Sequence, residues 1–229
     1  MKAIILAAGR GERMRPLTDR LPKPLLEVGG RPLIVWHIEA LRVAGVTDLV
    51  INHAHLGHKL VEALGDGSAL GVSIAWSAEP EGALESAGGI AHARHLLGDA
   101  TFVVVNGDIW CDADFAALAR AASGLHADGD LAHLLLVPNP PHNPGGDFVL
   151  RDDRVLDEIA GRLTFSGIGA YHPSLFDGLD PDAPAKLAPL LRAAMREGRV
   201  SGALHRGHWH DVGTPQRLAD VDALARKAR

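Results

Sequence analysis

The sequence has little cysteine, no long apolar run and no excess of positive charge. Cys111 is its only cysteine, so no internal disulfide can form, which is typical of a reducing compartment. No apolar run reaches the roughly 18 residues of a membrane helix. The first apolar run is also too short for a signal-peptide core, so the cytoplasm is the expected location. A net charge of −5 argues against a nucleic-acid partner.

What remains is an ordinary soluble composition, with 47% hydrophobic residues in 229 positions and a mean hydropathy of +0.06. A chain of this length can bury one full core, and two small domains would be unusual. We therefore expect a single domain spanning residues 1–229.

The first half of the chain alternates short apolar runs with segments of helical spacing. Strands are predicted at 2–7, 48–52, 72–76 and 101–105, and helices at 32–44, 58–64, 86–97 (with Ser86 as its N-cap) and 114–122. This alternation predicts an α/β fold with a mainly parallel, Rossmann-like sheet and helices on both faces. Ligands of such sheets bind beyond the carboxyl ends of the strands, where the loops after the first and fourth predicted strands lie.

The second half is richer in short strands. They are predicted at 133–137, 148–150, 155–159 and 166–171, around a loop at 138–146 that holds four prolines. A helix is predicted at 186–195, and Thr214 with Pro215 opens a last one. This half is expected to form a small β-rich lid on the sheet.

The loop after the first strand, LAAGRGERMRPLTDRLPKP, is rich in glycine and arginine. It lacks the third glycine of a dinucleotide-binding turn, where Met14 stands, and it contains no Gly-Lys-Ser/Thr triplet of a P-loop. Its small residues Ala7, Ala8, Gly9 and Gly11 allow backbone N–H groups to approach an anion. Arg10, Arg13, Arg15 and Lys23 add charges suited to a polyphosphate. Judged by charge alone, a solvated basic loop is an equal alternative.

The longer stretch LAAGRGERMRPLTDRLPKPLLEV resembles the signature of the sugar-nucleotide pyrophosphorylases, which join a sugar 1-phosphate to a nucleoside triphosphate. Further segments resemble this family in the same order along the chain: LESAGGI, VVNGDIWCD, FSGIGAYHPSLF and WHDVGTPQRL. The resemblance implies a nucleotide-binding part at about 1–130 and a sugar-binding part at about 131–229.

The resemblance also implies roles for individual residues. Arg13 and Lys23 would be catalytic, and Asp108 and Asp211 would hold Mg²⁺. Arg13 and Lys23 are both expected to be exposed. The implied nucleotide contacts are Ala7, Ala8, Gly9, Gly11, Glu85, Ser86 and Asn106. The implied sugar contacts are Gly146, Glu158, Ser166 and Gly167, with Asp147 and Asn139 as weaker candidates. The chain departs from the family pattern at Glu85, where glycine is usual, and at Ser86, where threonine is usual.

Within the family, the segments look most like those of bacterial N-acetylmuramate α-1-phosphate uridylyltransferases. This implies UTP and N-acetylmuramate α-1-phosphate as substrates, in peptidoglycan recycling. Mannose-1-phosphate guanylyltransferases, glucose-1-phosphate nucleotidyltransferases and cytidylyltransferases of phosphocholine-type substrates are the alternatives, with a non-catalytic nucleotide-binding regulator as the rival from another class. A monomer or a homodimer is expected.

Thirteen histidines do not suggest zinc, because no cysteine assists them. His208 or His210, beside Asp211, is a candidate contact for substrate phosphate. Cys111 is expected to be a packing residue and not a nucleophile.

Overall fold

A nine-stranded mixed sheet runs through the computed structural model, which describes residues 1–80 and 84–227. Its strand order is β5-β4-β1-β6-β11-β8-β12-β10-β9. The first four strands in this order are mutually parallel: β5 (Ser73–Ala78), β4 (Asp48–His53), β1 (Lys2–Leu6) and β6 (Phe102–Asn106). They confirm the predicted α/β sheet, in which helices connect successive parallel strands.

The β-rich second half extends this sheet. β11 (Arg162–Tyr171) lies antiparallel to both β6 and β8 (Ala132–Val137), so the parallel order ends at β6. Beyond β8 the sheet continues with β12 (Val200–Leu204), β10 (Arg154–Leu156) and β9 (Phe148–Arg151). The strand predicted at 155–159 ends early, at Leu156, and β12 was not predicted.

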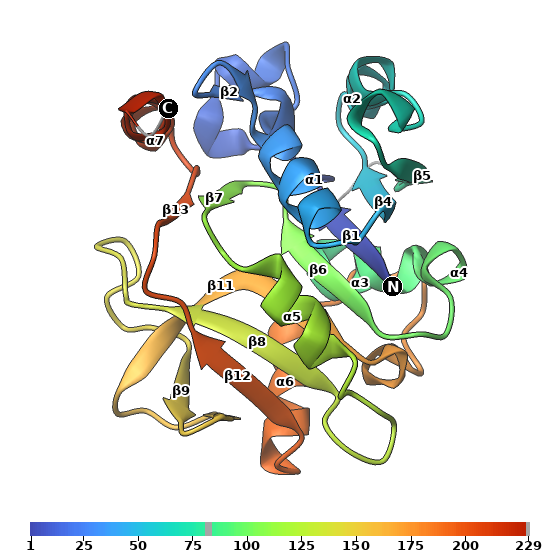
Figure 1. Ribbon diagram of the computed structural model, residues 1–229, viewed down its shortest axis with the longest axis vertical. Helices are drawn as coiled ribbons and strands as arrows, with labels where there is room; N and C mark the ends of the chain where they lie inside the picture. Colours follow the sequence, from blue (N-terminus) through green and yellow to red (C-terminus); the bar gives the residue numbers. More distant parts are fainter. Residues whose placement is uncertain (81–83, 228–229) are drawn as a thin grey trace.

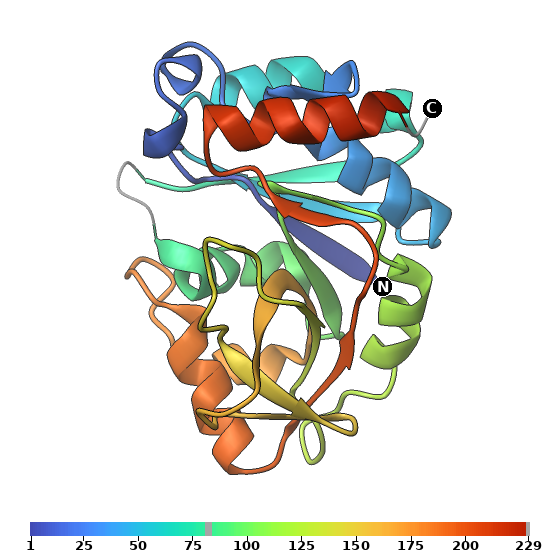
Figure 2. The same cartoon turned by 90° about the vertical axis from the view of Figure 1, so that its left-hand side faces the viewer.

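Helices cover both faces of the sheet (Figures 1 and 2). One face carries α1 (Leu33–Val43), α2 (Gly57–Leu64) and α5 (Phe115–Ala122); the other carries α3 (Glu85–His92), α4 (Arg94–Leu97) and α6 (Leu187–Arg196). Alternate residues of β1 serve the two cores: Ala3 and Ile5 pack under α1, and Ile4 packs under α3. The continuous apolar run of β1 therefore reflects burial on both sides.

The helix predicted at 86–97 is two helices, because the chain turns at Ala93 between α3 and α4. The N-cap assignment was wrong: Leu84 is the N-cap, and Ser86 lies inside α3. The prediction for the last helix is confirmed, since α7 (Pro215–Lys227) begins at Pro215 and the Thr214 hydroxyl accepts a hydrogen bond from the Arg217 N–H at 3.3 Å.

Two short ribbons were not predicted, and one of them joins distant parts of the chain while the other is a tight hairpin. β7 (Ile109–Cys111) pairs with β13 (Trp209–Asp211), and β2 (Glu27–Val28) pairs with β3 (Arg31–Pro32). Helix α7 lies along the β2–β3 ribbon, where Asp222 accepts a hydrogen bond from the Gly29 N–H at 2.8 Å (Figure 1). A third apolar cluster under α7 contains Met14 and Trp110. Within the described part of the chain, no helix has the length and apolarity needed to cross a membrane.

Candidate active site

A cavity of about 360 Å³ opens at the carboxyl ends of β1, β4 and β6. Its lining includes most of the residues expected at a nucleotide site: Ala7, Ala8, Gly9, Gly11, Arg13, Lys23, Glu85, Ser86, Asn106 and Asp108. They come from four separate segments of sequence. Most of the residues expected at the nucleotide site therefore lie at the carboxyl ends of the parallel strands, where ligands of such sheets bind.

The arginine-rich loop is held to the core rather than lying free in solvent. Met14 is buried in the third apolar cluster. The Thr18 hydroxyl donates to the carbonyl of Gly11 at 2.8 Å. Gly11 has φ +69°, and a Cβ there would lie 2.9 Å from the Thr18 methyl carbon, so a larger residue would disturb this turn. The loop is therefore a shaped surface on which its charges have set positions.

Three of the four arginines of this loop, Arg10, Arg13 and Arg15, are not equivalent. Arg10 pairs with Glu12 at 2.5 Å, and Arg15 pairs with Glu12 and with Asp19 at 3.3 and 3.1 Å. Arg13 is exposed, lines the cavity and has no ion-pair partner among the described residues. An unneutralised guanidinium facing a cavity is available for phosphate oxygens.

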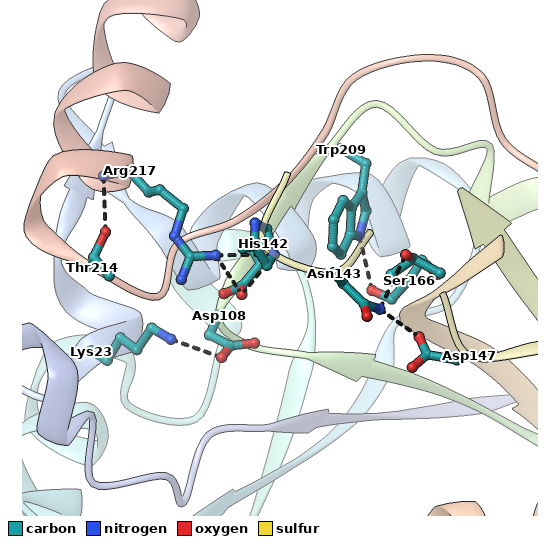
Figure 3. Close-up of polar contacts among 11 residues, drawn as sticks. Lys23, Asp108, His142, Asn143, Asp147, Ser166, Trp209, Thr214 and Arg217 are labelled. Atoms are coloured by element: carbon teal, nitrogen blue, oxygen red, sulfur yellow. Dashed lines mark hydrogen bonds and ion pairs between the residues drawn. The ribbon is translucent and has the colours of Figure 1, made fainter. Parts of the chain in front are cut away.

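Lys23 is buried, contrary to the expectation that it is exposed. Only 8% of the residue is accessible, and its Nζ donates to Oδ2 of Asp108 at 2.7 Å (Figure 3). Pro22 and Pro24 flank it, and the turn is closed by the Leu26 N–H donating to the Lys23 carbonyl at 3.0 Å. The ammonium group is thus already in position before substrate binds. The entropic cost of ordering this long side chain is incurred during folding and not during binding.

Asp108 and Asp211 lie on neighbouring segments, although they are far apart in sequence. β7 and β13 pair so that Ile109 faces Asp211, and the Val212 N–H donates to the Asp108 carbonyl at 2.8 Å. His37, fully buried on α1, bonds through Nε2 to the Ile109 carbonyl at 2.7 Å. Burial lowers the pKa of His37 to about 4, so its neutral ring braces this ribbon at neutral pH.

The carboxylate of Asp211 has one satisfied oxygen and one unsatisfied oxygen. Oδ2 accepts from Arg217 Nη1 at 2.7 Å and lies 3.5 Å from His142 Nε2 (Figure 3). Oδ1 is buried and has no hydrogen-bond partner among the described residues. Gly213 allows this packing, because a Cβ there would lie 3.0 Å from Oδ1 and 2.4 Å from Arg217 Nη2. An unpaired buried carboxylate oxygen is a position that a cation would satisfy.

His142 brings the proline-rich loop at 138–146 against the Asp211 side of the site, and it was not anticipated. His210, a candidate phosphate contact, alternates with Asp211 along β13 and so points to the opposite face. His208 and His210 instead pack around the Trp110 ring, with centroids 6.0 and 5.9 Å away. Cys111 is the last residue of β7. Burial raises the pKa of its thiol to about 11, which is consistent with a packing role.

Two buried polar residues of the first cavity also escaped the sequence analysis. Asn52 accepts from the Ala7 N–H at 2.7 Å and donates to Glu79 at 2.5 Å, and Glu79 in turn accepts from the Leu84 N–H at 3.4 Å. This chain of bonds ties the arginine-rich loop to the start of α3. The available signal was Asn52 itself, a polar residue at the end of an apolar strand.

Glu85 has φ +61°, a left-handed backbone conformation that favours glycine. This explains why glycine is usual at the corresponding family position. Glu85 is exposed and lines the cavity, so its carboxylate is not buried without a partner.

A second cavity of about 420 Å³ adjoins the first and shares Glu85, Ser86 and Asn106 with it. Of the expected sugar contacts, Gly167 and the weaker candidate Asp147 line it. The other candidates are not brought to it. Ser166 is buried and bonded to the Ile168 N–H and Trp209 Nε1, and Glu158 is an exposed partner of Arg151 at 2.6 Å.

Gly146 and Asn139 have structural contacts nearby. Gly146 has φ +63°, and a Cβ there would lie 2.8 Å from the Arg162 backbone. Asn139 bonds to the Thr164 hydroxyl at 2.9 Å and to the Arg162 carbonyl at 2.9 Å, which shapes the loop beside the cavity.

Comparison with known proteins gives the same picture. The family model of nucleotidyl transferases matches residues 2–153. The chain is 59% identical to the N-acetylmuramate α-1-phosphate uridylyltransferase of Neisseria meningitidis serogroup B, over 98% of each chain. It is 37% identical to the protein of that name from Caulobacter vibrioides, over 99% of this chain and 96% of the other.

More distant relatives share the same core. The chain is 33% identical to the mannose-1-phosphate guanyltransferase of Schizosaccharomyces pombe, covering 94% of itself but 62% of that longer protein. A Bacillus anthracis crystal structure, described as a glucose-1-phosphate thymidylyltransferase in complex with sucrose, superposes with a TM-score of 0.86 at 25% identity, covering 99% of this chain and 95% of that one.

Proposed function

Because the chain belongs to the nucleotidyl transferase family, we propose that it transfers a uridylyl group from UTP to N-acetylmuramate α-1-phosphate, releasing pyrophosphate. The observation that carries the proposal is the Lys23–Asp108 pair in a cavity that also presents Arg13, with Asp211 on the strand that pairs beside Asp108. A second cavity, which adjoins the first, offers a place for the acceptor sugar.

In the proposed reaction an oxygen of the sugar phosphate attacks the α-phosphorus of the triphosphate. The bond from that phosphorus to the bridging oxygen breaks, and its electron pair leaves with pyrophosphate. The attacking phosphate is already ionised near neutral pH, because its second pKa is about 6. No side chain is needed as a general base, so catalysis consists of positioning two anions and offsetting their repulsion.

The roles of the side chains follow from their places. Arg13, exposed and free of carboxylates among the described residues, binds the phosphates that leave as pyrophosphate. Lys23 uses one of its three N–H donors on Asp108 and offers the others to the reacting phosphates. The backbone N–H groups of Ala7 to Gly11, with Glu85 and Ser86, line the space proposed for the nucleotide, and Asn106 lies between the two cavities.

We further propose Mg²⁺ as the cofactor, held by Asp108 and Asp211. The unsatisfied Oδ1 of Asp211 is a position that a cation would fill. The described part of the chain contains no cluster of three or more His, Cys, Asp or Glu side chains that could hold a metal ion by itself. Mg²⁺ is commonly bound by one or two carboxylates together with substrate phosphates. When bound, it would supply positive charge that neutralises phosphate oxygens.

The expected setting is the cytoplasm, in peptidoglycan recycling. Preference for UTP and this acceptor is proposed from the 59% identical relative, whereas the guanyltransferase relatives are about 33% identical. A mannose or glucose 1-phosphate acceptor would keep the same chemistry with a different sugar cavity.

The test is an assay of pyrophosphate release with purified protein and Mg²⁺, pairing each nucleoside triphosphate with a panel of sugar 1-phosphates. UTP with N-acetylmuramate α-1-phosphate should give the highest kcat/KM. A preference for GTP with mannose 1-phosphate would refute the substrate assignment, and no transfer with any pair would refute the enzyme assignment. Without Mg²⁺, in the presence of a chelator, release should cease.

A further inference from the structure

The second cavity carries two cationic side chains that the proposed reaction does not use. Lys186, the N-cap residue of α6, and Arg192, within α6, both line it. Lys186 is exposed and has no ion-pair or side-chain hydrogen-bond partner among residues 1–80 and 84–227. Arg192 lies 3.4 Å from Asp157 and 5.6 Å from the centre of the Phe148 ring. Lys186 is therefore the one cation on the α6 side of the cavity without a carboxylate partner among the described residues, and the two carboxylates of the lining, Glu85 and Asp147, come from other segments.

The backbone that carries Lys186 is held in place relative to the first cavity. The residue before it, Ala185, donates its N–H to the Leu84 carbonyl at 2.9 Å, and its carbonyl accepts from Ala87 and Gly88 at 2.9 and 3.0 Å. This backbone ladder joins the start of α6 to the start of α3, where Glu85 and Ser86 separate the two cavities. The amino end of α6 adds the partial positive charge of a helix terminus beside Lys186.

One residue that lines the same cavity carries a buried hydroxyl without a partner among the described residues. Tyr171 is fully buried and lines the cavity, and its Oη has no hydrogen-bond partner among the described residues. The ring lies over Gly169, where a Cβ would come within 2.8 Å of Oη. Glycine at this position leaves room for the Tyr171 hydroxyl beside β11. Buried hydroxyls are almost always hydrogen-bonded, so this one points to a polar group of a ligand.

We infer that this cavity selects acceptor sugars that carry a carboxylate, with Lys186 and the amino end of α6 receiving the carboxylate and the Tyr171 hydroxyl binding a polar substituent of the ring. The inference rests on the proposed function, and it names the side chains that determine which sugar 1-phosphate the protein accepts. N-acetylmuramate bears a lactyl ether that ends in a carboxylate, and N-acetylglucosamine is the same sugar without that ether. Arg192 contributes to the positive field and keeps its contact with Asp157.

The competing role for Lys186 is binding of the phosphate that all acceptors share. The two acceptors N-acetylmuramate α-1-phosphate and N-acetylglucosamine α-1-phosphate separate these roles, because they differ only in the carboxylate-bearing ether. A charge-assisted hydrogen bond of ordinary strength corresponds to roughly a 10- to 100-fold effect on affinity.

The experiment compares wild type, Lys186→Met and the control Lys227→Met, which changes an exposed lysine of α7 outside both cavities. It measures kcat/KM for both acceptors, and their dissociation constants by calorimetry beside an unreactive UTP analogue with a methylene bridge between the α- and β-phosphorus. In Lys186→Met, kcat/KM for the muramate acceptor should fall at least about 10-fold, mainly through KM, with little change for the glucosamine acceptor. Equal losses for both acceptors, or no loss, would overturn the inference.

Tyr171→Phe tests the hydroxyl separately. Removing an unsatisfied buried hydroxyl should leave the free energy of unfolding unchanged or slightly higher, while kcat/KM for both N-acetylated acceptors falls several-fold. An unchanged kcat/KM would overturn the role of Tyr171. If the wild type transfers to neither acceptor, the proposed function fails; if it transfers well but Lys186→Met keeps the wild-type acceptor ratio, only the carboxylate inference fails.

Discussion

The ammonium nitrogen of Lys23 lies 2.7 Å from Oδ2 of Asp108, although the two residues are 85 positions apart. One oxygen of a proposed metal-binding carboxylate is thereby tied to a proposed catalytic cation. The pair holds opposite charges together in the absence of substrate, which lowers the cost of keeping either one in a partly enclosed cavity. The two side chains therefore form one functional unit, and changing either should affect the other.

Replacing Lys23 with methionine should reduce kcat/KM by at least roughly 10²-fold, the usual effect of removing one transition-state donor. Methionine retains much of the buried stem but removes the charge, so Asp108 also loses its partner. Steady-state pyrophosphate release measures the effect, and circular dichroism confirms folding. The matched control Lys227→Met, at an exposed lysine of α7 outside both cavities, should retain wild-type turnover. Unchanged turnover in Lys23→Met would remove this residue from the mechanism.

Arg13→Met should also lower kcat/KM by roughly 10²-fold, but with a melting temperature close to that of wild type. The side chain is exposed and has no ion-pair partner in the described ranges, so its loss removes no contact that stabilises the fold. Arg15→Met serves as the control, because Arg15 is committed to Glu12 and Asp19. If both variants lost activity equally, the distinction between the loop arginines would be wrong.

Asp211→Asn should lower both the affinity for Mg²⁺ and the rate of the reaction. The amide keeps the shape of the side chain but removes the negative charge, so we expect a higher Mg²⁺ concentration at half-maximal activity and a loss of kcat of roughly 10²-fold or more. Magnesium titrations of activity measure this shift. Asp220→Asn, on the exposed face of α7, is the control. An unshifted Mg²⁺ titration would exclude Asp211 as a ligand.

Glu85→Gly should leave the free energy of unfolding unchanged or raise it. Glu85 occupies a left-handed conformation that costs a residue with a Cβ about 1 kcal/mol, and glycine relieves this strain. The same change at Glu62, an exposed position inside α2, should instead lower it by roughly 1 kcal/mol. Urea denaturation of both variants compares the signs. Equal destabilisation at the two sites would contradict the strain at Glu85.

Stability should fall on acidification, in part because of His37. Burial lowers the pKa of His37 to about 4 from an ordinary value of 6.5. Below about pH 6.5 the unfolded chain takes up a proton that the folded protein refuses, so the stabilisation is complete above 6.5 and is lost as the pH falls towards 4. The loss is roughly 3 kcal/mol in total.

Urea denaturation between pH 7.5 and 4.5 measures this loss. His37→Gln, whose amide can still donate to the Ile109 carbonyl, should flatten the pH dependence of the free energy of unfolding. His58→Gln, on the exposed face of α2, should not. Parallel pH curves for wild type and His37→Gln would show that His37 does not contribute.

Sequence patterns were sufficient for the repeating part of the fold. The strands β1, β4, β5 and β6 and the helices between them carry periodicities that arise from burial on two faces or one, and these are local properties of the chain. The anion-binding loop after β1 followed from the same reasoning, because loops after parallel strands meet at one edge, whereas Glu85, Ser86, Asn106 and Asp108 came from the family resemblance. The substrate class came from long motifs rather than from any physical reading of cavity shape.

Short ribbons were beyond such patterns. β7 and β13 have three residues each, too few to show a period, yet their pairing is what brings Asp108 beside Asp211. The burial of Lys23 and the approach of His142 to Asp211 likewise depend on contacts between residues 69 or more positions apart.

The sequence by itself determined the parallel core, the cradle of small residues after β1 and the identity of the charged side chains, because each is written in local spacing and residue type. Only the tertiary structure decided which of those charges are paired, which are free, and which carboxylate oxygen and hydroxyl are left without partners. Charges and hydrogen bonds act over a few ångströms in space, and the folded chain alone determines those distances.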